Sequence, residues 1–398
     1  LRGLLAQDFQ GRAARLRALA KYLGEHKDKL QDWSLRTGAT RGDGAVDIDG
    51  GIITINSQAS MAAGELPSGN LIHEGPALPL GKKGGFAGTH VLVPRRGVAV
   101  AINAFNFPVW GLLEKFAPTF LAGMPCIAKP ATATSYLTEA VVRLMLESGL
   151  LPEGSLQLII GGTGDLLDRL DGQDVVTFTG SADTAAKLRA HPNVLRQGIP
   201  FNAEADSLNC AILAPDVNPD DEEFDLFVKE VHREMTVKAG QKCTAIRRAI
   251  VPRKHLDAVA AKLRERLAKT VVGDPAIEGV RMGALASKAQ QRDVAERVAE
   301  LARGNRVVFG EADGFAPRGE GVAEGAFFAP TLLLCEKPLS NTSVHDVEAF
   351  GPVSTLMPYG DIEEALVLAA RGKGSLVSTL VTRSPKLAAR VVPAAAAW

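Results

Sequence analysis

Apolar residues recur at helical spacing near the start of the chain. From Phe9 to Leu23 they return every three or four positions, so residues 8–32 are predicted to form a helix. Residues 40–97 are instead rich in Gly, Pro and polar side chains, which favours loops with short strands, one of them at residues 89–93.

From residue 97 onward, short β-branched runs alternate with helical stretches. The predicted strands are residues 98–103, 125–129, 156–160 and 175–179, and the predicted helices are residues 109–121, 135–148, 164–170 and 181–190. This alternation is typical of a parallel sheet with helices on both faces, which binds ligands beyond the carboxyl ends of its strands.

A second alternating region predicts a second α/β unit. Its predicted helices are residues 222–238, 254–269, 287–303 and 362–371, and its predicted strands are residues 210–213, 249–251, 330–334 and 375–382. No internal repeat or low-complexity linker separates the two regions.

Composition and charge restrict the class of protein without identifying it. The 398 residues are 46% hydrophobic and 23% charged, as in an ordinary globular protein of about two or three domains. The chain has 45 Lys plus Arg residues and 45 Asp plus Glu residues, so its formal net charge is zero. This charge balance does not indicate the basic surface that is typical of nucleic-acid-binding proteins. The sequence has no apolar run of about eighteen residues, so we expect no membrane span.

The four cysteines show none of the short paired spacings of a zinc site or a disulfide framework. Separate thiols of this kind fit a reducing cytoplasm, where we expect the protein to act. Cys126, Cys210 and Cys335 lie in apolar, strand-like runs and are predicted to be core residues.

The segment around Cys243 has features of a nucleophilic thiol. Nearby cations favour the reactive thiolate, and Gly240 permits an unusual backbone. The flanking cations are Lys238, Lys242, Arg247 and Arg248. Taken alone, a place in the core is still the commoner explanation for an isolated cysteine.

Five further segments carry polar or glycine residues beside apolar strands. Taken alone, each fits a solvated loop, a turn or a helix cap. Each also fits a chemical role, such as a general base, an oxyanion donor or a phosphate contact. The segments are residues 103–108, 127–132, 178–181, 201–209 and 348–353.

Together and in this order, the segments resemble the aldehyde dehydrogenase family over essentially the whole chain. The matching motifs are Asn106-Phe107-Pro108, Lys129-Pro130, Phe178-Thr179-Gly180-Ser181, Glu204, Gly240-Gln241-Lys242-Cys243 and Glu348-Ala349-Phe350-Gly351-Pro352. Residues 103–108, 205–208 and 239–248 further resemble one branch, the semialdehyde dehydrogenases of aerobic aromatic-acid breakdown through CoA thioesters.

The resemblance implies an α/β fold with two domains and a small element of oligomerisation strands. We expect a Rossmann-like dinucleotide-binding domain at residues 1–205, with the oligomerisation strands inserted at 76–97. An α/β catalytic domain is expected at 206–380. Residues 381–398 are expected to begin a C-terminal segment that returns to the first domain and continues beyond residue 398.

The resemblance also implies catalytic roles in the oxidation of an aldehyde to a carboxylic acid. Cys243 would form a thioester, the Asn106 amide would hold the oxyanion, and Glu204 would activate water for hydrolysis. Lys115 matches a family lysine associated with proton relay, although it fits a helix-surface cation equally well. Glu204 favours hydrolysis over the alternative of acyl transfer to free CoA, and a non-catalytic binding protein of the same fold is a second alternative.

The implied cofactor is a nicotinamide dinucleotide, with no metal. NAD-specific members often have a glutamate where this chain has Thr132; a carboxylate would repel a 2′-phosphate, so we expect NADP in preference to NAD. The expected partners are a small-molecule aldehyde, CoA-linked in this branch, and further copies of the chain. The residues expected to contact the cofactor are Phe105, Lys129, Pro130, Ala131, Thr132, Phe178, Gly180, Ser181, Glu348 and Phe350.

Overall fold

The computed structural model describes residues 2–82 and 85–396, which form two compact units. The first unit contains residues 1–33 and 44–205, and the second contains residues 34–43 and 206–398. Parts of two predicted segments, residues 83–84 of the insertion at 76–97 and residues 397–398 of the C-terminal segment, lie outside the described residues.

Residues 34–43 group with the second unit, and so do the described residues of 381–398. Residues 34–43 are held there by a local contact, because the Asp43 carboxylate accepts a hydrogen bond from the Lys238 N–H at 3.0 Å. Gly38 also lies so close to the carbonyl group of Ala284 that a Cβ would not fit.

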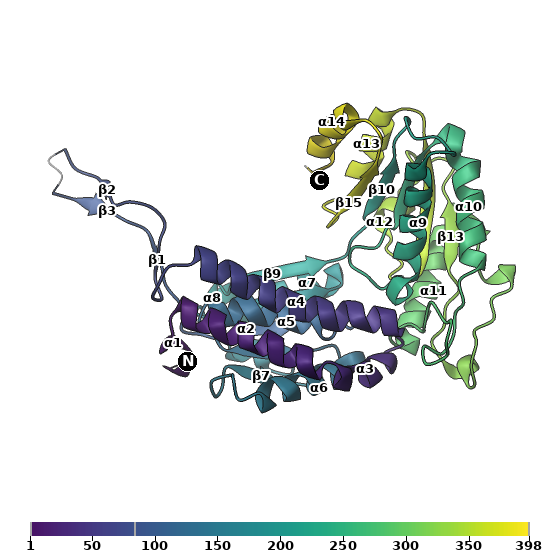
Figure 1. The fold of residues 1–398 in the computed structure, drawn as a ribbon. Coiled ribbons are helices and arrows are strands. Elements are labelled where there is room, and N and C mark those ends of the chain that lie inside the picture. The colour runs from purple at the N-terminus through teal and green to yellow at the C-terminus, as the bar shows by residue number, and fades with distance from the viewer. Residues whose placement is uncertain (1, 83–84, 397–398) are drawn as a thin grey trace. The chain divides into compact units, whose positions relative to one another are not determined.

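The first unit is built on a five-stranded parallel sheet, as the alternating pattern predicted (Figure 1). The order across the sheet is β7-β6-β5-β8-β9. The strands are β5 (Ala99–Ile102), β6 (Cys126–Lys129), β7 (Leu156–Leu158), β8 (Val175–Gly180) and β9 (Phe201–Ala205). The predicted loop at residues 201–209 is therefore wrong in its first half, because those residues add an edge strand beside β8.

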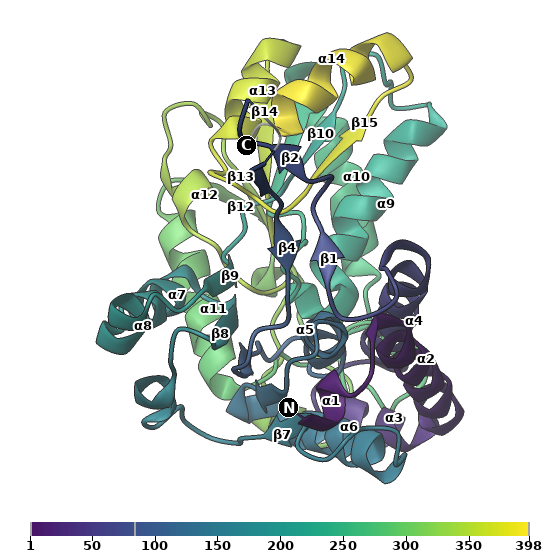
Figure 2. The same ribbon diagram turned by 90° about the vertical axis from the view of Figure 1, so that its left-hand side faces the viewer.

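Helices cover both faces of this sheet. One core contains Ala101 and Ala128 of the sheet and is covered by α2 (Phe9–His26), α4 (Arg41–Glu65), α5 (Trp110–Leu121) and α6 (Ser135–Glu147). The other contains Val100 and Val176 and is covered by η2 (Leu166–Arg169), α7 (Ala182–Arg189) and α8 (Pro192–Gln197). Figure 2 shows α7 and α8 on one side of β8 and β9, and α4 and α5 on the other. Short helices α1 (Arg2–Leu5), α3 (Asp28–Leu35) and η1 (Thr132–Thr134) complete this part of the chain.

The strand order creates a switch point between β5 and β8. From β5 the chain adds β6 and β7 on one side, and then returns to add β8 and β9 on the other. Loops that leave neighbouring strands in opposite directions open a crevice at the carboxyl ends of those strands, which is where such sheets bind ligands. The segments after β5 and after β8 are two of those that the sequence selected.

Helix α4 was not predicted, because the sequence analysis assigned residues 40–97 to loops and short strands. Its glycines lower helix propensity, but its buried residues Ile48, Ile55, Ala59 and Ala62 recur at helical spacing. Two of the glycines, Gly50 and Gly51, lie against Trp110 of α5. Close packing between the two helices therefore outweighs the local preference of the segment.

Two short antiparallel strand pairs lie between α4 and β5 (Figure 1). They are β1 (Ile72–His73) with β4 (Val91–Leu92), and β2 (Leu78–Pro79) with β3 (Ala87–Gly88). The strand predicted at residues 89–93 is present only as the shorter β4. The exposed apolar side chains of this region are Leu71, Leu78, Leu80, Phe86, Val91, Leu92 and Val93.

The second unit is a six-stranded sheet in the order β12-β13-β14-β11-β10-β15. All neighbours are parallel except β12, which runs antiparallel to β13 at one edge. The strands are β10 (Cys210–Leu213), β11 (Arg248–Pro252), β12 (Arg306–Phe309), β13 (Thr331–Leu334), β14 (Val353–Tyr359) and β15 (Ser378–Val381). The sequence analysis did not predict β12 or the buried central strand β14, whose Pro358 is unusual inside a sheet.

Helices again cover both faces. On one face α9 (Glu222–Thr236) and α10 (Leu256–Ala268) pack on the sheet, and on the other α11 (Lys288–Ala302) and α13 (Ile362–Ala370) do so. The remaining helical segments are η3 (Val237–Gly240), η4 (Arg253–His255), η5 (Glu311–Asp313), η6 (Val322–Glu324), α12 (Ser343–Asp346) and α14 (Pro385–Ala396). Within the described ranges, no helix has the length and apolar character needed to cross a membrane.

The close contact between α4 and α5 can be tested by adding one methyl group. A Cβ at Gly50 would lie 2.5 Å from a ring carbon of Trp110, so Gly50→Ala should destabilise the protein by about 1–3 kcal/mol. Gly64 is on the same helix with no atom within 4 Å of an added Cβ, so Gly64→Ala should stabilise it by up to about 1 kcal/mol. Thermal unfolding measures both variants, and equal shifts would contradict the packing argument.

Candidate active site

Cys243 lies in a loop between α9 and β11 that begins with three residues in the left-handed region. The φ values of Lys238, Ala239 and Gly240 are 55°, 51° and 68°. For residues other than glycine, each such conformation costs about 1–3 kcal/mol and persists only where surrounding contacts impose it. The contacts of this turn therefore decide where Cys243 lies.

Buried hydrogen bonds impose the turn. The Lys238 N–H donates to Asp43, and the Gln241 side-chain amide donates to the Lys238 carbonyl at 2.9 Å. The Gln241 side-chain oxygen accepts from the Ala286 N–H, also at 2.9 Å. Gly240 lies so close to the Gly351 carbonyl group that no side chain fits there, which explains the glycine.

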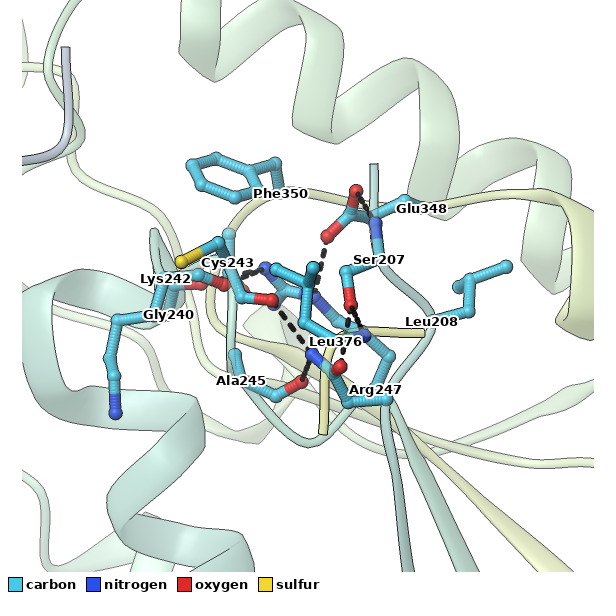
Figure 3. A network of polar contacts seen from close by, with 12 residues as sticks. Ser207, Leu208, Gly240, Lys242, Cys243, Ala245, Arg247, Glu348, Phe350 and Leu376 are labelled. Carbon is cyan, nitrogen blue, oxygen red and sulfur yellow. Dashed lines mark hydrogen bonds and ion pairs between the residues drawn. The ribbon is translucent and has the colours of Figure 1, made fainter. Parts of the chain in front are cut away.

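Arg247 joins this loop to the loop that carries Glu348 and Phe350. Its guanidinium donates to the carbonyl oxygens of Gly240 at 2.9 Å and Gly351 at 2.8 Å. It also pairs with the Glu348 carboxylate at 3.3 Å and lies 5.3 Å from the centre of the Phe350 ring. Figure 3 shows the Cys243 sulfur pointing away from this network of polar contacts.

Ser207 and Asn209, which lie just before β10, also hold the loops of Cys243 and Glu348 in place. The Asn209 amide donates to the carbonyl oxygens of Cys243 at 2.8 Å and Ala245 at 3.0 Å. The Ser207 N–H donates to Glu348 at 3.0 Å, and its hydroxyl donates to the Asn209 side-chain oxygen at 2.5 Å. The sequence analysis did not select Ser207 or Asn209 individually. Their position directly before a buried strand is the signal that would have found them.

Only part of the predicted cationic surroundings of Cys243 is found. The Lys242 ammonium pairs with Glu234 at 2.6 Å, so its charge is already neutralised. Arg248 donates instead to the carbonyl oxygens of Leu208 at 2.6 Å and Leu368 at 2.6 Å, neither of which belongs to the Cys243 loop. Among these cations, Arg247 is the one whose guanidinium bonds directly to the backbone of that loop.

Burial changes the pKa values of both partners in the Arg247–Glu348 pair. It raises the pKa of Glu348, while the Arg247 guanidinium and the Ser207 N–H oppose that shift. It lowers the pKa of Arg247, and the charge of Glu348 opposes the change. The pair is thus a buried ionic contact, which is stable only while both members are present.

The other three cysteines are buried, as predicted. Burial raises the pKa of Cys126 to about 12 and also raises the pKa values of Cys210 and Cys335. Cys243 is partly exposed. Because the thiolate is the nucleophilic form, Cys243 is the cysteine suited to react with a ligand.

In the first unit, Glu204 and Lys115 lie side by side. Glu204 is in β9 opposite Thr179 of β8, and its carboxylate is 3.6 Å from the Lys115 ammonium. Lys115 also pairs with Glu114 at 3.1 Å. The side chains of Lys115 and Glu204 are 19% and 27% exposed, which leaves the carboxylate accessible to a water molecule.

The loop that contains Asn106 is held by neighbouring side chains. The Thr134 hydroxyl donates to the Phe105 carbonyl, and the Thr138 hydroxyl donates to the Pro108 carbonyl, both at 3.0 Å. Asp47 of α4 accepts the Trp110 N–H at 2.8 Å at the start of α5. Asn106 is itself buried, and these hydrogen bonds hold the backbone on either side of it.

The remaining predicted cofactor residues of this unit lie at the carboxyl ends of β6 and β8. Lys129 ends β6, and burial lowers its pKa. Pro130, Ala131 and the exposed Thr132 follow it. Gly180 ends β8 and lies against the ring of Phe178, where a Cβ would be 2.6 Å from a ring carbon. Ser181 caps α7 by accepting the Thr184 N–H.

Asn103 supports a ligand site at the switch point. It follows β5 directly and is only 5% exposed, yet neither polar atom of its amide has a hydrogen-bond partner among the described residues. An unpartnered buried amide is costly unless a ligand or water satisfies it. With the helix N-terminus at Ser181, the crevice therefore fits a dinucleotide. The sequence analysis included Asn103 only as part of a segment.

Comparisons with known proteins find relatives that match nearly the whole chain. The sequence model of the aldehyde dehydrogenase family matches residues 3–397. The 3,4-dehydroadipyl-CoA semialdehyde dehydrogenase of Aromatoleum evansii is 49% identical over 391 residues, which is 98% of this chain and 76% of that protein.

Solved structures share the fold. Betaine aldehyde dehydrogenase of Staphylococcus aureus, in complex with NAD+, is 25% identical with a TM-score of 0.84 over 98% of this chain and 74% of that one. Succinic semialdehyde dehydrogenase of Streptococcus pyogenes, in complex with NADP+, is 22% identical with a TM-score of 0.81 over 97% of this chain and 80% of that one. The chain therefore belongs to the aldehyde dehydrogenase family.

Proposed function

We propose that the chain oxidises a CoA-linked semialdehyde of aromatic-acid degradation to the free carboxylic acid, with NADP as the preferred cofactor. The name of the Aromatoleum evansii relative supports the substrate class. The Glu204 carboxylate, held beside Lys115 at the edge of the sheet, is the observation that carries the choice of hydrolysis.

The first step belongs to Cys243. Its thiolate attacks the aldehyde carbon, and the carbonyl oxygen takes up the negative charge. The Asn106 amide and the Cys243 N–H would donate to this oxyanion. A nicotinamide dinucleotide, when bound, would supply the hydride acceptor. Loss of hydride from the carbon bonded to the Cys243 sulfur leaves a thioester on Cys243.

Hydrolysis of the thioester belongs to Glu204. Its carboxylate takes a proton from a water molecule, which attacks the acyl carbon and releases the acid and the Cys243 thiolate. The ion pair between Lys115 and Glu204 at 3.6 Å supports a role for Lys115 in relaying the proton that Glu204 takes from water. Both residues come from the first unit and their pairing needs no part of the second.

Each unit contains residues suited to contacting a nicotinamide dinucleotide. Lys129, Gly180 and Ser181 would contact the adenosine ribose and the pyrophosphate, since a helix N-terminus favours an anion. Glu348 would accept the hydroxyls of the other ribose, and Phe350 would lie beside the nicotinamide ring. Phe105, Pro130, Ala131 and Phe178 would form the remaining walls.

We also propose that the protein acts as a homo-oligomer in the cytoplasm. Leu78, Val91 and Leu92 are exposed on the short strands, and Leu71, Leu80, Phe86 and Val93 are exposed beside them. Exposed apolar surface of this kind marks protein contacts. The buried cysteines Cys126, Cys210 and Cys335 are free thiols, which suits a reducing compartment.

A substrate panel tests the proposed activity. CoA-linked semialdehydes should reduce NADP and give the free acid without added CoA, and they should be better substrates than the free semialdehydes. Cys243→Ala should abolish this oxidation while it binds the cofactor normally. Mass spectrometry identifies the product, and an acyl-CoA formed only with added CoA would select acyl transfer instead.

Glu204→Gln tests the hydrolytic step. The variant should release about one equivalent of NADPH in a burst and then stall, because the thioester is no longer hydrolysed. Stopped-flow absorbance records the burst. Glu114→Gln is the matched control, since it removes the other carboxylate beside Lys115 and should continue to turn over. Unchanged steady-state rates in Glu204→Gln would reject the role.

Thr132→Glu tests the cofactor preference. A carboxylate at this exposed position should repel the 2′-phosphate and lower the ratio of kcat/KM for NADP over NAD by roughly tenfold or more. Thr132→Gln has the same size without the charge and should change the ratio less. A wild-type enzyme that prefers NAD would contradict the expectation.

A further inference from the structure

Arg247 has no role in the steps proposed above, yet its contacts lie on both loops that those steps use. It is the last residue before β11, and its side chain is buried. On one side it donates to the carbonyl oxygens of Gly240 and Lys242, which are three residues and one residue before Cys243. On the other it contacts Glu348 and Gly351.

These contacts require the forked shape of arginine. Separate N–H groups of the guanidinium reach Gly240, Gly351 and Glu348 at the same time (Figure 3). A lysine ammonium carries its donors on a single atom and cannot span the same acceptors.

Stability alone does not account for an arginine here. The free-energy cost of taking a guanidinium out of water is comparable to what its pairing returns, and a protein with an apolar side chain of similar volume is often at least as stable. The neighbouring Arg248 offers the contrast. It donates to the carbonyl oxygens of Leu208 and Leu368, and its contacts include neither Cys243 nor Glu348.

We propose that Arg247 is a positioning residue that holds the Cys243 sulfur in register with Glu348 and Phe350. This inference deepens the proposed function and rests on it. Through Arg247, the backbone before the nucleophile and the backbone beside the proposed nicotinamide ribose contact are joined as one rigid element.

The positive charge of Arg247, like its hydrogen bonds, supports a reactive Cys243. Burial lowers its pKa, and the negative charges of Glu348 and the Cys243 thiolate oppose that shift. Coulomb attraction is mutual, so the guanidinium in turn favours the thiolate of Cys243.

The test compares three variants of the full chain: Arg247→Gln, Arg247→Lys and Arg248→Lys. Two readouts are used, the rate at which iodoacetamide alkylates Cys243 and the split between kcat and the KM for NADP. Cys243→Ala gives the alkylation background, which is small because the other cysteines are buried.

Arg247→Gln should lower the alkylation rate roughly tenfold, because a nearby positive charge is lost. It should also lower kcat and raise the KM for NADP, because Glu348 loses its partner. Arg247→Lys should restore most of the alkylation rate but little of kcat, since it returns the charge without the fork. Arg248→Lys should lower the thermal midpoint and leave the alkylation rate unchanged.

A folded Arg247→Gln protein with wild-type alkylation and kcat would overturn the proposal. If that variant does not fold, Arg247→Lys decides alone, and wild-type kcat in it would overturn the proposal equally. Alkylation requires no turnover, so it tests Arg247 even if no aldehyde in the panel is oxidised. Failure of the proposed function and failure of this inference are therefore distinguishable.

Discussion

The left-handed turn at residues 238–240 is the constraint on which the position of Cys243 in the second unit depends. Two of its three residues are not glycine, so the conformation exists only because buried groups hold it. Asp43 and Gln241 satisfy its backbone, and Gly351 leaves room only for a glycine at its third position. The direction in which Cys243 leaves the loop follows from this turn.

Each unit is built on a sheet whose strands are all or mostly parallel. Parallel strands bring loops that are far apart in the sequence to one edge, where their polar groups can act together. In the first unit this edge holds Asn103 after β5, Lys129 at the end of β6 and Glu204 in β9. In the second unit the polar segments before β10 and β11 and before β14 form the network around Arg247. In both units the sheet therefore holds the ends of these loops, and the loops bring their polar side chains together.

The sequence pattern predicted secondary structure correctly in segments where the burial of the side chains and their intrinsic propensity favour the same structure. The strands β5, β6 and β8 were predicted because apolar β-branched runs bounded by turns have few alternatives. Prediction failed where packing overrides propensity: α4 contains glycines that its contact with Trp110 requires, and β14 contains Pro358. Both segments are stabilised by partners that no local window contains.

The sequence by itself determined the family, the alternating α/β character and the residue types that carry the chemistry, since motif order and periodicity are properties of the chain alone. Only the tertiary structure decided which cations act on which groups. It assigns Lys242 to Glu234 and Arg248 to the carbonyls of another helix, and leaves Arg247 to the nucleophile loop. The physical reason is that a charge interacts through space, so its neighbours are set by folding and not by its position along the chain.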